Sequence, residues 1–339
     1  MRIFYTGSIH TSWLSTCLLR MNVLKELGHE VIEFDHLPYN YRGGKFLSRV
    51  YRRLKWGPPI FDYNRDMLKL ATETQPDVVW VDKGIWLFPE TIQKMKALGA
   101  KIVHYTPDPA LCFHKSRFFL RSVPHYDLVV TTKRYEIDLF HEMGVKELMV
   151  QYPMFYPEVH VPPDPSPDEL AEQQCDAVFI GTFTPDRYVY INPLIEAGLD
   201  VRIYGNQWER CKDPILRKGI AGGPHSGRDY NLRLACGRLA LGLLSPLVPD
   251  TSTTRSVEIP AVGGFFFAQR TDEHKEMFEE DKEAVFFDSV GEMMEKATYY
   301  LNHPEERLRI AQAGLQRTRT SPYDGKSQIS QVVEAIKSL

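Results

Sequence analysis

One loop in the second half of the sequence combines glycine, hydroxyl side chains and arginine, the residue types that bind phosphate groups. This loop, GTFTPDR, begins at Gly181 directly after the apolar run DAVFI. The backbone N–H groups of Gly181 and Thr182 can hold an anion there, and Arg187 can neutralise it. The pattern predicts a diphosphate site; the alternative is a helix cap formed by Asp186, with Arg187 in solvent.

A second loop, DTSTTRSVEIPAVGG, runs from Asp250 to Gly264 and carries Arg255 and Glu258. It begins with hydroxyl residues, continues into a short helix and ends at a Gly-Gly pair before an apolar strand. A carboxylate such as Glu258 can accept two hydrogen bonds from a ribose diol, and the loop with the helix start can hold phosphate. The alternative is a surface carboxylate on a short helix.

A third loop, GSIHTS, begins at Gly7 after the apolar run RIFYT. Glycine lets the backbone approach a ligand closely, and the start of the following helix can bind an anion or a sugar hydroxyl. The alternative is a tight turn with a helix cap from Thr11 or Ser12. The loop lacks the GxGxxG spacing, so it does not indicate a dinucleotide cofactor.

Two stretches combine basic and aromatic side chains: Tyr41–Trp56 (YRGGKFLSRVYRRLKW) and His114–Arg121 (HKSRFFLR). The first holds six basic residues and no acidic one. Such a segment can lie on anionic lipid or bind an anionic acceptor; the alternative is a solvated helix or loop packed on its own domain. The net charge of -3 argues against nucleic acid as the partner.

Length and composition set the frame for these loops. The chain has 339 residues, enough for two domains, and its 43% hydrophobic and 25% charged residues exclude a disordered, collagen-like or coiled-coil chain. No apolar run reaches the roughly 18 residues of a membrane helix. Five cysteines without a CxxC pair, and an N-terminus that enters a strand directly, predict reduced thiols and a cytoplasmic protein.

Apolar runs alternate with amphipathic segments along the whole chain, which predicts an α/β fold with parallel sheets. Expected strands include 2–6, 30–34, 77–81, 101–105, 127–131, 176–180, 200–204, 239–243, 264–268 and 284–287; expected helices include 13–27, 89–98, 134–143, 188–197, 290–302 and 304–318. Both halves begin with strand, glycine loop and helix, the order of a Rossmann-like domain. In such folds ligands bind beyond the carboxyl ends of the strands, where the three loops lie.

These residues resemble the GT-B glycosyltransferases, most closely the spore-maturation, CgeB-like branch of the family 1/4-type enzymes. The resemblance rests on RSVEIPA from Arg255 with the Gly-Gly pair, RTDEH from Arg270, EAVFFD from Glu283, the FIG turn with Arg187, and Tyr323. It covers most of the C-terminal half. The N-terminal half matches more weakly, at DKG and YTPDP.

The resemblance implies a GT-B fold of two Rossmann-like domains that face each other across a cleft. The expected parts are an acceptor domain at 1–156, a Pro-rich linker at 157–174, a nucleotide-sugar donor domain at 175–320, and a C-terminal helix at 321–339 that packs back on the first domain. The five prolines between positions 157 and 167 predict an extended linker on their own account.

The resemblance also assigns donor contacts. Related retaining enzymes carry two acids in an E-x7-E motif; Glu258 matches the second, and Asp250 stands where the first Glu would be. Glu273 is expected to be a further donor contact. Arg187, and secondarily Arg255, would neutralise the leaving diphosphate, so we expect no metal and no cofactor.

On the acceptor side we expect Gly7, Ser8, Lys83 and Tyr105. If transfer inverts the anomeric centre, a base must take the proton of the acceptor hydroxyl, and Asp82, Asp108 or His10 could serve. If transfer retains the configuration, which the resemblance favours, the leaving phosphate can take that proton. The alternative for Asp108 is a turn residue.

The sequence thus predicts a glycosyltransferase that moves a sugar from a nucleotide-sugar donor to an unidentified acceptor, which is a glycan, a protein or a lipid-linked molecule. Contact with a membrane surface through Tyr41–Trp56 belongs to the prediction. Two alternatives stay open: a nucleotide-sugar epimerase, and a non-catalytic GT-B-like binding or structural protein. Asp250 in place of Glu gives weight to the second.

Overall fold

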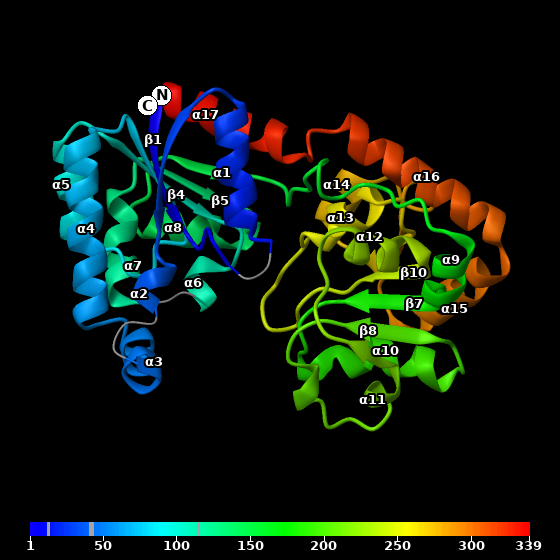
Figure 1. Ribbon diagram of the computed structural model, residues 1–339. Coiled ribbons are helices and arrows are strands. Elements are labelled where there is room, and N and C mark those ends of the chain that lie inside the picture. The colour runs from blue at the N-terminus through cyan, green and yellow to red at the C-terminus, as the bar shows by residue number, and fades with distance from the viewer. Residues whose placement is uncertain (12–13, 41–43, 114–115) are drawn as a thin grey trace. The chain divides into compact units, whose positions relative to one another are not determined.

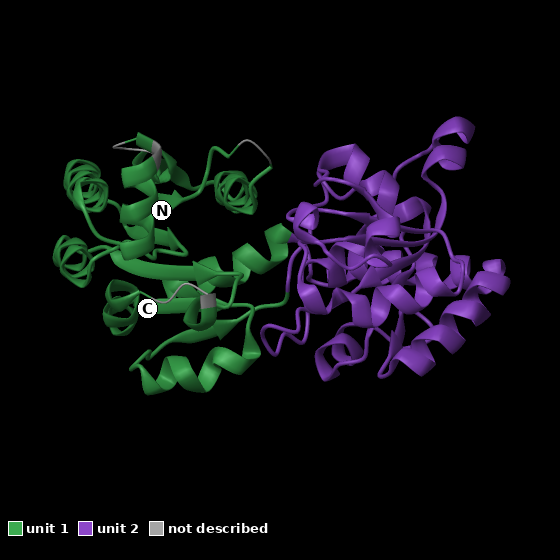
Figure 2. Ribbon diagram, turned by 90° about the horizontal axis from the view of Figure 1, so that it is seen from below, with its two compact units in different colours: residues 1–152, 325–339 green, residues 153–324 purple. Residues whose placement is uncertain are grey.

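The computed structural model describes residues 1–11, 14–40, 44–113 and 116–339. These residues form two compact units (Figures 1 and 2): residues 1–152 with 325–339, and residues 153–324. The expectations that fall on Ser12, Trp13, Tyr41, Arg42, His114 and Lys115 lie outside the described residues.

The first unit is built on a six-stranded parallel sheet with the order β2-β1-β3-β4-β5-β6. Its strands are β1 Arg2–Gly7, β2 Glu30–Asp35, β3 Val78–Asp82, β4 Lys101–Thr106, β5 Leu128–Thr131 and β6 Leu148–Val150. Its helices are α1 Thr16–Glu26, α2 Leu37–Asn40, α3 Gly44–Leu54, α4 Pro58–Thr74, α5 Pro89–Ala97, α6 Ala110–Phe113, α7 Arg117–Ser122, α8 Ile137–Glu142 and α17 Gly325–Lys337.

Burial on both faces explains why the central strands are almost wholly apolar. All five residues of β3 are buried: Val79 and Val81 join the core beneath α4 and α5, while Trp80 and Asp82 point to the other face. Helix α17 packs beside α1 and buries apolar residues such as Ile329 and Val333 at helical spacing.

The second unit has another six-stranded parallel sheet, with the order β12-β11-β10-β7-β8-β9. Its strands are β7 Cys175–Ile180, β8 Val201–Tyr204, β9 Ile220–Gly222, β10 Gly237–Gly242, β11 Phe266–Gln269 and β12 Val285–Phe287. Its helices are α9 Pro167–Gln173, α10 Tyr188–Glu196, α11 Leu216–Gly219, α12 Gly227–Cys236, α13 Arg255–Ala261, α14 Asp272–Met277, α15 Val290–Asn302 and α16 Pro304–Thr320.

The predicted extended linker at 157–174 is corrected by the structure, because this stretch belongs to the second unit and contains α9. Ser166 and Glu169 form a reciprocal capping box that starts this helix directly after the prolines. Upstream, the Asn231 side chain of α12 donates to the carbonyls of Val159 and Val161, at 2.7 and 3.1 Å. The stretch is therefore fastened to the sheet domain that follows it.

Candidate functional site

The order of the second sheet fixes where a ligand can bind. The chain leaves β7 toward β8 and β9, then crosses to β10 on the other side of β7. Such a switch point leaves a crevice beyond the carboxyl ends of the two strands, where α/β proteins bind their ligands. Here those ends are Ile180 and Gly242; the predicted loop at Gly181 starts directly after the first, and the predicted loop at Asp250 follows eight residues after the second.

Close backbone packing shapes the loop at Gly181. A Cβ on Gly205 would lie 2.0 Å from the Gly181 carbonyl oxygen, and Gly205 has a φ of +141°, so only glycine fits there. The indole N–H of Trp208 donates to the same carbonyl at 2.8 Å. Thr182, the next residue, is exposed. The structure thus places Gly181 and Thr182 at the carboxyl end of β7, as predicted for an anion site.

Glu258 on α13 is a buried carboxylate held by three protein groups. The Tyr230 hydroxyl donates to Oε2 at 2.7 Å, the Arg255 guanidinium pairs with the same oxygen, and His160 Nε2 lies 3.5 Å from Oε1. Burial alone would raise the pKa of Glu258, but the Arg255 charge and the hydrogen bonds from His160 and Tyr230 outweigh it and hold the pKa well below its usual range. Glu258 is therefore ionised.

Arg255 connects this carboxylate to the switch point, since its Nε donates to the carbonyl of Ile180 at 2.9 Å. A carboxylate has about four lone-pair positions, and three protein donors surround Glu258. Arg255 and Tyr230 both contact Oε2, so a ribose hydroxyl would bind Oε1, beside His160. The ribose role of Glu258 stays a prediction.

Arg187 lies on the other side of the switch point and is buried. Its Nη1 donates to the carbonyls of Leu243 and Leu244 at 3.0 and 2.6 Å, and its guanidinium lies 4.9 Å from the ring centroid of Phe179. Arg187 forms no ion pair with a carboxylate among the described residues. Burial lowers the pKa of Arg187 to about 10, and the charge of Asp186 offsets part of this effect. Arg187 thus fixes the loop after β10 while it remains charged at neutral pH.

Glu273 is corrected from a donor contact to a loop anchor. It is only 2% exposed, and the Thr251 hydroxyl donates to its carboxylate. The Thr271 hydroxyl donates in turn to the Thr251 carbonyl at 2.7 Å. These bonds hold the hydroxyl-rich loop in which Asp250 is half-buried, so Glu273 acts on a ligand only through the loop.

His274 ties α14 to α13. Its Nε2 lies 2.8 Å from the Ser256 hydroxyl, and its Nδ1 lies 2.7 Å from the Gln269 carbonyl oxygen. Burial lowers the pKa of His274 to about 4, so the imidazole is neutral and Nδ1 carries the proton that the carbonyl accepts.

Sequence reasoning missed a cavity of about 520 Å³ beside the Gly181 loop. It lies at the carboxyl ends of β8 and β9 and is lined by Gly205, Trp208, Glu209, Arg217, Gly222 and Gly223, among others. The Gly222-Gly223-Pro224 turn was the signal available in the sequence, because consecutive glycines let a ligand approach the backbone.

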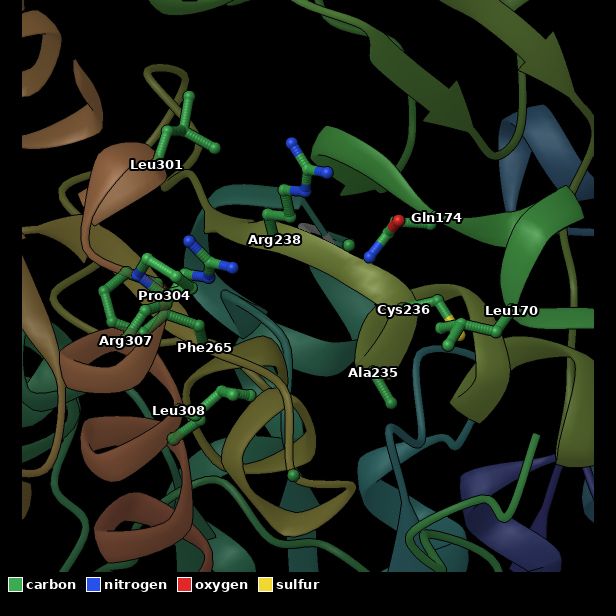
Figure 3. A pocket seen from close by; sticks show the side chains of 13 residues that line it. Leu170, Gln174, Ala235, Cys236, Arg238, Phe265, Leu301, Pro304, Arg307 and Leu308 are labelled. Atoms are coloured by element: carbon green, nitrogen blue, oxygen red, sulfur yellow. The ribbon is translucent and has the colours of Figure 1, made fainter. Parts of the chain in front are cut away.

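Another cavity of the second unit has a volume of about 500 Å³ (Figure 3). Its lining includes Gly237, the first residue of β10, so it lies at the amino end of this strand, opposite the switch point. Arg307 and Arg238 extend into it. Both have structural partners: Arg307 donates to the Tyr300 carbonyl at 2.6 Å, and Arg238 pairs with Asp176 at 2.9 Å. This cavity is remote from the switch point.

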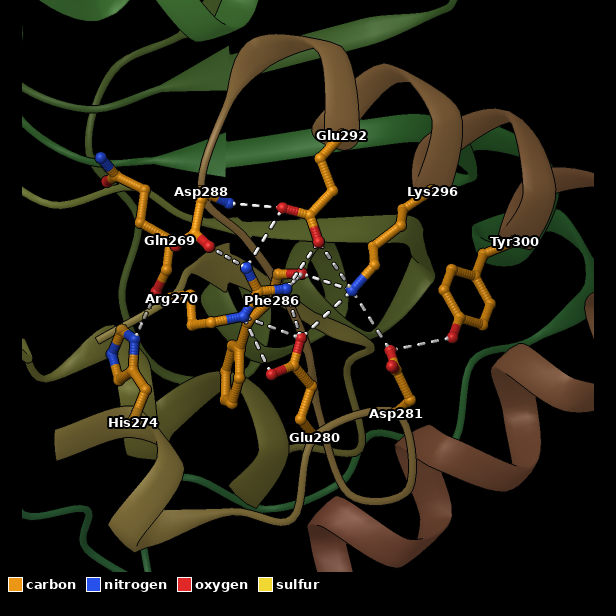
Figure 4. Close-up of polar contacts among 10 residues, drawn as sticks. All are labelled: Gln269, Arg270, His274, Glu280, Asp281, Phe286, Asp288, Glu292, Lys296 and Tyr300. Atoms are coloured by element: carbon orange, nitrogen blue, oxygen red, sulfur yellow. Dashed lines mark hydrogen bonds and ion pairs between the residues drawn. The ribbon is translucent and has the colours of Figure 1, made fainter. Parts of the chain in front are cut away.

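An ion network braces the ends of β11 and β12 (Figure 4). The Arg270 guanidinium donates to Glu280 and to Glu292, both at 2.6 Å, and also pairs with Asp288. Lys296 adds a contact of 3.1 Å to Glu280. The hydrogen bonds that Arg270 donates to Glu280 and Glu292 raise its pKa far above the ordinary value. Arg270, the first residue of the RTDEH motif, therefore has a structural role.

The first unit has its own switch point, between β1 and β3. A cavity of about 230 Å³ lies there, lined by Ser8, His36, Arg52, Tyr63, Lys83 and Trp86, among others. The Ser8 hydroxyl lies 2.9 Å from His36 Nε2, and burial lowers the pKa of His36 to about 4. Two predicted acceptor-side residues, Ser8 and Lys83, line this cavity, while Gly7 packs toward Asp82.

Asp82 and Tyr105 are corrected, because both are buried in the core. The Asp82 side chain is fully buried and pairs with Arg20 at 2.7 Å, and the Tyr5 hydroxyl donates to it at 2.9 Å. Tyr105 stacks on Trp80, with ring centroids 5.6 Å apart. A base must reach the substrate hydroxyl, which Asp82 cannot do from this position.

Asp108 is half-buried and His10 is exposed, and each has a partner. Asp108 pairs with Lys83; burial would lower the pKa of Lys83, but Asp108 outweighs it and raises that pKa. His10 Nε2 lies 3.1 Å from Glu33. Their roles as bases stay predictions. In the described part of the chain, no three His, Cys, Asp or Glu side chains cluster as a metal site would require.

Comparison with known proteins supports a two-domain glycosyltransferase fold. Residues 187–333 match the family model described as "Glycosyl transferase-like". Among solved structures, Anabaena Alr3699/HepE in complex with UDP-glucose has a TM-score of 0.68 at 13% identity, covering 100% of both chains. A glycosyltransferase from Rickettsia africae gives 0.69 at 12%, covering 99% of this chain and 98% of that one. No curated protein matches the sequence.

A sucrose-phosphate synthase from Thermosynechococcus elongatus gives a TM-score of 0.69 at 9% identity, covering 99% of this chain and 98% of that one. The chain therefore has the GT-B fold of two Rossmann-like domains, and its residues 187–333 are similar to the glycosyl transferase-like family. The predicted α/β fold class is confirmed.

We expect Arg20→Met to lower the free energy of unfolding by about 3–5 kcal/mol, because it leaves the Asp82 carboxylate buried without its partner. Urea unfolding measures the loss. Arg2→Met is the control, since it removes an exposed ion pair with Glu30 that contributes less than about 1 kcal/mol. Equal losses in the two variants would contradict a structural role for the Arg20–Asp82 pair.

The free energy of unfolding is expected to fall as the pH drops from 6.5 toward 4. In that window the unfolded chain protonates His274 while the folded protein keeps it neutral, so the slope approaches about 1.4 kcal/mol per pH unit for this histidine. Urea unfolding across this range should give a flatter curve for His274→Gln. His303→Gln, at an exposed position, should leave the slope unchanged; a wild-type slope in His274→Gln would refute the assignment.

Proposed function

We propose that this protein is a glycosyltransferase that binds a nucleotide-sugar donor at the β7/β10 switch point of its second unit. The observation that carries the proposal is the pair of arginines beside the two strand ends: Arg187 at Leu243 and Arg255 at Ile180. Arginine is the residue suited to a diphosphate, because its planar donors match phosphate oxygens. The similarity to the glycosyl transferase-like family, which begins at Arg187, supports the same proposal.

The donor diphosphate is bound by Arg187, Arg255 and the backbone N–H groups of Gly181 and Thr182. These donors stabilise the negative charge that develops on the leaving diphosphate, so the reaction proceeds without a metal ion or other cofactor. The cavity formed by Gly205, Gly222 and Gly223 takes the nucleobase. A uridine nucleotide is the first candidate, since HepE binds UDP-glucose and shares this fold.

The sugar moves with retention of configuration. The bond from the anomeric carbon to the diphosphate breaks, the bond to the acceptor oxygen forms, and the leaving diphosphate takes the acceptor proton. This route suits the first unit, where Asp82 is buried and Asp108 is paired with Lys83. Within the proposal, Asp250 takes the sugar-contacting place of the first acid in E-x7-E, and the chain belongs to the CgeB-like branch. The proposal includes a cytoplasmic location with contact to the membrane surface.

Titration with UDP, GDP, dTDP, ADP and CMP, with and without magnesium, tests the donor site. A nucleotide at 100 times its dissociation constant adds about 2.7 kcal/mol to the stability of the folded protein, which a thermal-shift assay detects. Selective stabilisation by one diphosphate, independent of magnesium, is expected. No response in folded protein would favour the non-catalytic alternative, and donor conversion without an acceptor would favour the epimerase.

Glu258→Gln is expected to weaken binding of the stabilising diphosphate by about 1–3 kcal/mol, because it removes the charge that a ribose hydroxyl and Arg255 share. Calorimetry gives the dissociation constant. Glu280→Gln is the matched control, since it removes a partly buried carboxylate from the Arg270 network of the same unit. Equal affinity in wild type and Glu258→Gln would refute the ribose role.

A further inference from the structure

Helix α3 has an apolar face without a partner in the described part of the first unit. At 100° per residue, Phe46, Leu47, Val50 and Leu54 form one stripe along it. Phe46 is 74% exposed and Leu54 is 65% exposed, although both are large apolar side chains. The helix is fastened on its other side, where Ser48 is buried. A stripe of this kind needs a covering surface.

Aromatic residues extend the stripe beyond the helix. Trp56, just after α3, packs edge-on against Phe61 at 4.5 Å between ring centroids and stacks on Phe118 of α7 at 5.6 Å. Both Trp56 and Phe61 are more than 40% exposed. Tryptophan at the border of an apolar surface is typical of the membrane interface, because its ring is apolar and its N–H is polar.

Arginines border the apolar stripe. Arg49 and Arg53 are exposed on α3, and Arg117 lies 5.5 Å from the ring centroid of Trp56. Arg121 on α7 is also exposed, with Glu90 at 3.6 Å as an acidic neighbour. Helix α3 itself carries no acidic residue, so its surface is strongly cationic.

Nearby acids on α4 are already occupied. Asp62 and Asp66 both pair with Arg65, at 2.7 and 2.9 Å, and the Tyr39 hydroxyl also donates to Asp66. Arg65 thus compensates one of these two negative charges, and the other offsets only part of the positive charge of α3. Figure 1 shows α3 at the lower edge of the first unit, beyond the ends of α2 and α4.

We propose that this surface, formed by α3, Trp56, Phe61 and the exposed side of α7, docks on an anionic lipid bilayer. The apolar stripe enters the boundary between headgroups and acyl chains while the arginines contact lipid phosphates. No helix in the described part of the chain is long and apolar enough to cross a membrane, so the protein would lie on the surface. A second copy of the chain fits this surface less well, because its arginines would face identical arginines.

The docking has a consequence for the acceptor. Arg52 on α3 lines the cavity that also contains Ser8 and Lys83. At 100° per residue Arg52 lies opposite the apolar stripe, so α3 separates the docked bilayer from the cavity, and an acceptor anchored in the membrane would reach the cavity past this helix. This consequence rests on the proposed transfer reaction, whereas the docking itself does not.

Sedimentation with vesicles tests the docking. The full chain is mixed with vesicles of phosphatidylcholine alone or of phosphatidylcholine with phosphatidylglycerol, and the bound fraction is measured. Binding only to the anionic vesicles is expected, and it should weaken as salt rises. Equal binding to both vesicle types, or no binding to either, would overturn the proposal. So would dimerisation of the free protein through α3, seen in sedimentation velocity and abolished by the variants below.

Two paired variants assign the contact to α3. Phe46→Ser with Leu54→Ser should lower the partition coefficient at least tenfold, roughly the loss expected for two interfacial apolar side chains. Leu308→Ser on α16 is the matched control, since Leu308 is also 65% exposed. Arg49→Gln and Arg53→Gln should each lower it roughly fivefold, while Lys218→Gln in the second unit should not.

Stabilisation by UDP separates this proposal from the proposed function. The Phe46→Ser, Leu54→Ser double variant changes only exposed side chains of the first unit, so it should keep the wild-type thermal shift with UDP. Lost vesicle binding with a retained shift supports docking through α3. Vesicle binding by a chain that shows no nucleotide response would leave the docking in place and refute the donor site.

Discussion

The second unit depends on one buried charge, the carboxylate of Glu258. A buried carboxylate is stable only when opposite charge and hydrogen bonds compensate its lost hydration. Here the compensation comes from three different places in the chain: Arg255 one turn away, Tyr230 on α12, and His160 in the stretch before α9. Arg255 also bonds the last residue of β7. One ionised group thus fixes the short helix α13 against the strand end where the donor is proposed to bind.

The first unit has a similar arrangement with a different result. Asp82 ends β3 at the switch point, and a fully buried Arg20 neutralises it from α1. Because that pair faces the core, the groups left at the strand ends are Ser8 and Lys83. Each sheet therefore uses one buried ion pair to hold the loops at its switch point, and the residues available to a ligand are those beside the pair.

Patterns formed by residues close together in the sequence were predictable, whereas contacts between residues far apart in the sequence were not. Apolar runs located most strands, and the glycine loops located both switch points, since parallel strands bind ligands at their carboxyl ends. The same reasoning predicted Asp82 as a candidate catalytic base. It failed because β3 is buried on both faces, so period-two alternation does not reveal which side faces a ligand. The partner that decides the matter, Arg20, lies 62 residues away. Helix α9 was not predicted, although its capping box joins residues only three positions apart, because the five prolines indicated an extended linker.

Arg187 differs from the buried Arg20 of the first unit in its partners, and the difference bears on the proposed function. Arg20 has a carboxylate partner, whereas Arg187 is compensated by two carbonyls and the face of Phe179. Carbonyl dipoles stabilise a guanidinium but do not neutralise it, and a pKa of about 10 keeps it charged. Its Nε has no hydrogen-bond partner among the described residues. A charged guanidinium held by carbonyls is compatible with the diphosphate site proposed at the β7/β10 switch point. Arg307 is also buried and donates to a carbonyl, but it lines the cavity remote from the switch point, so position rather than burial distinguishes Arg187.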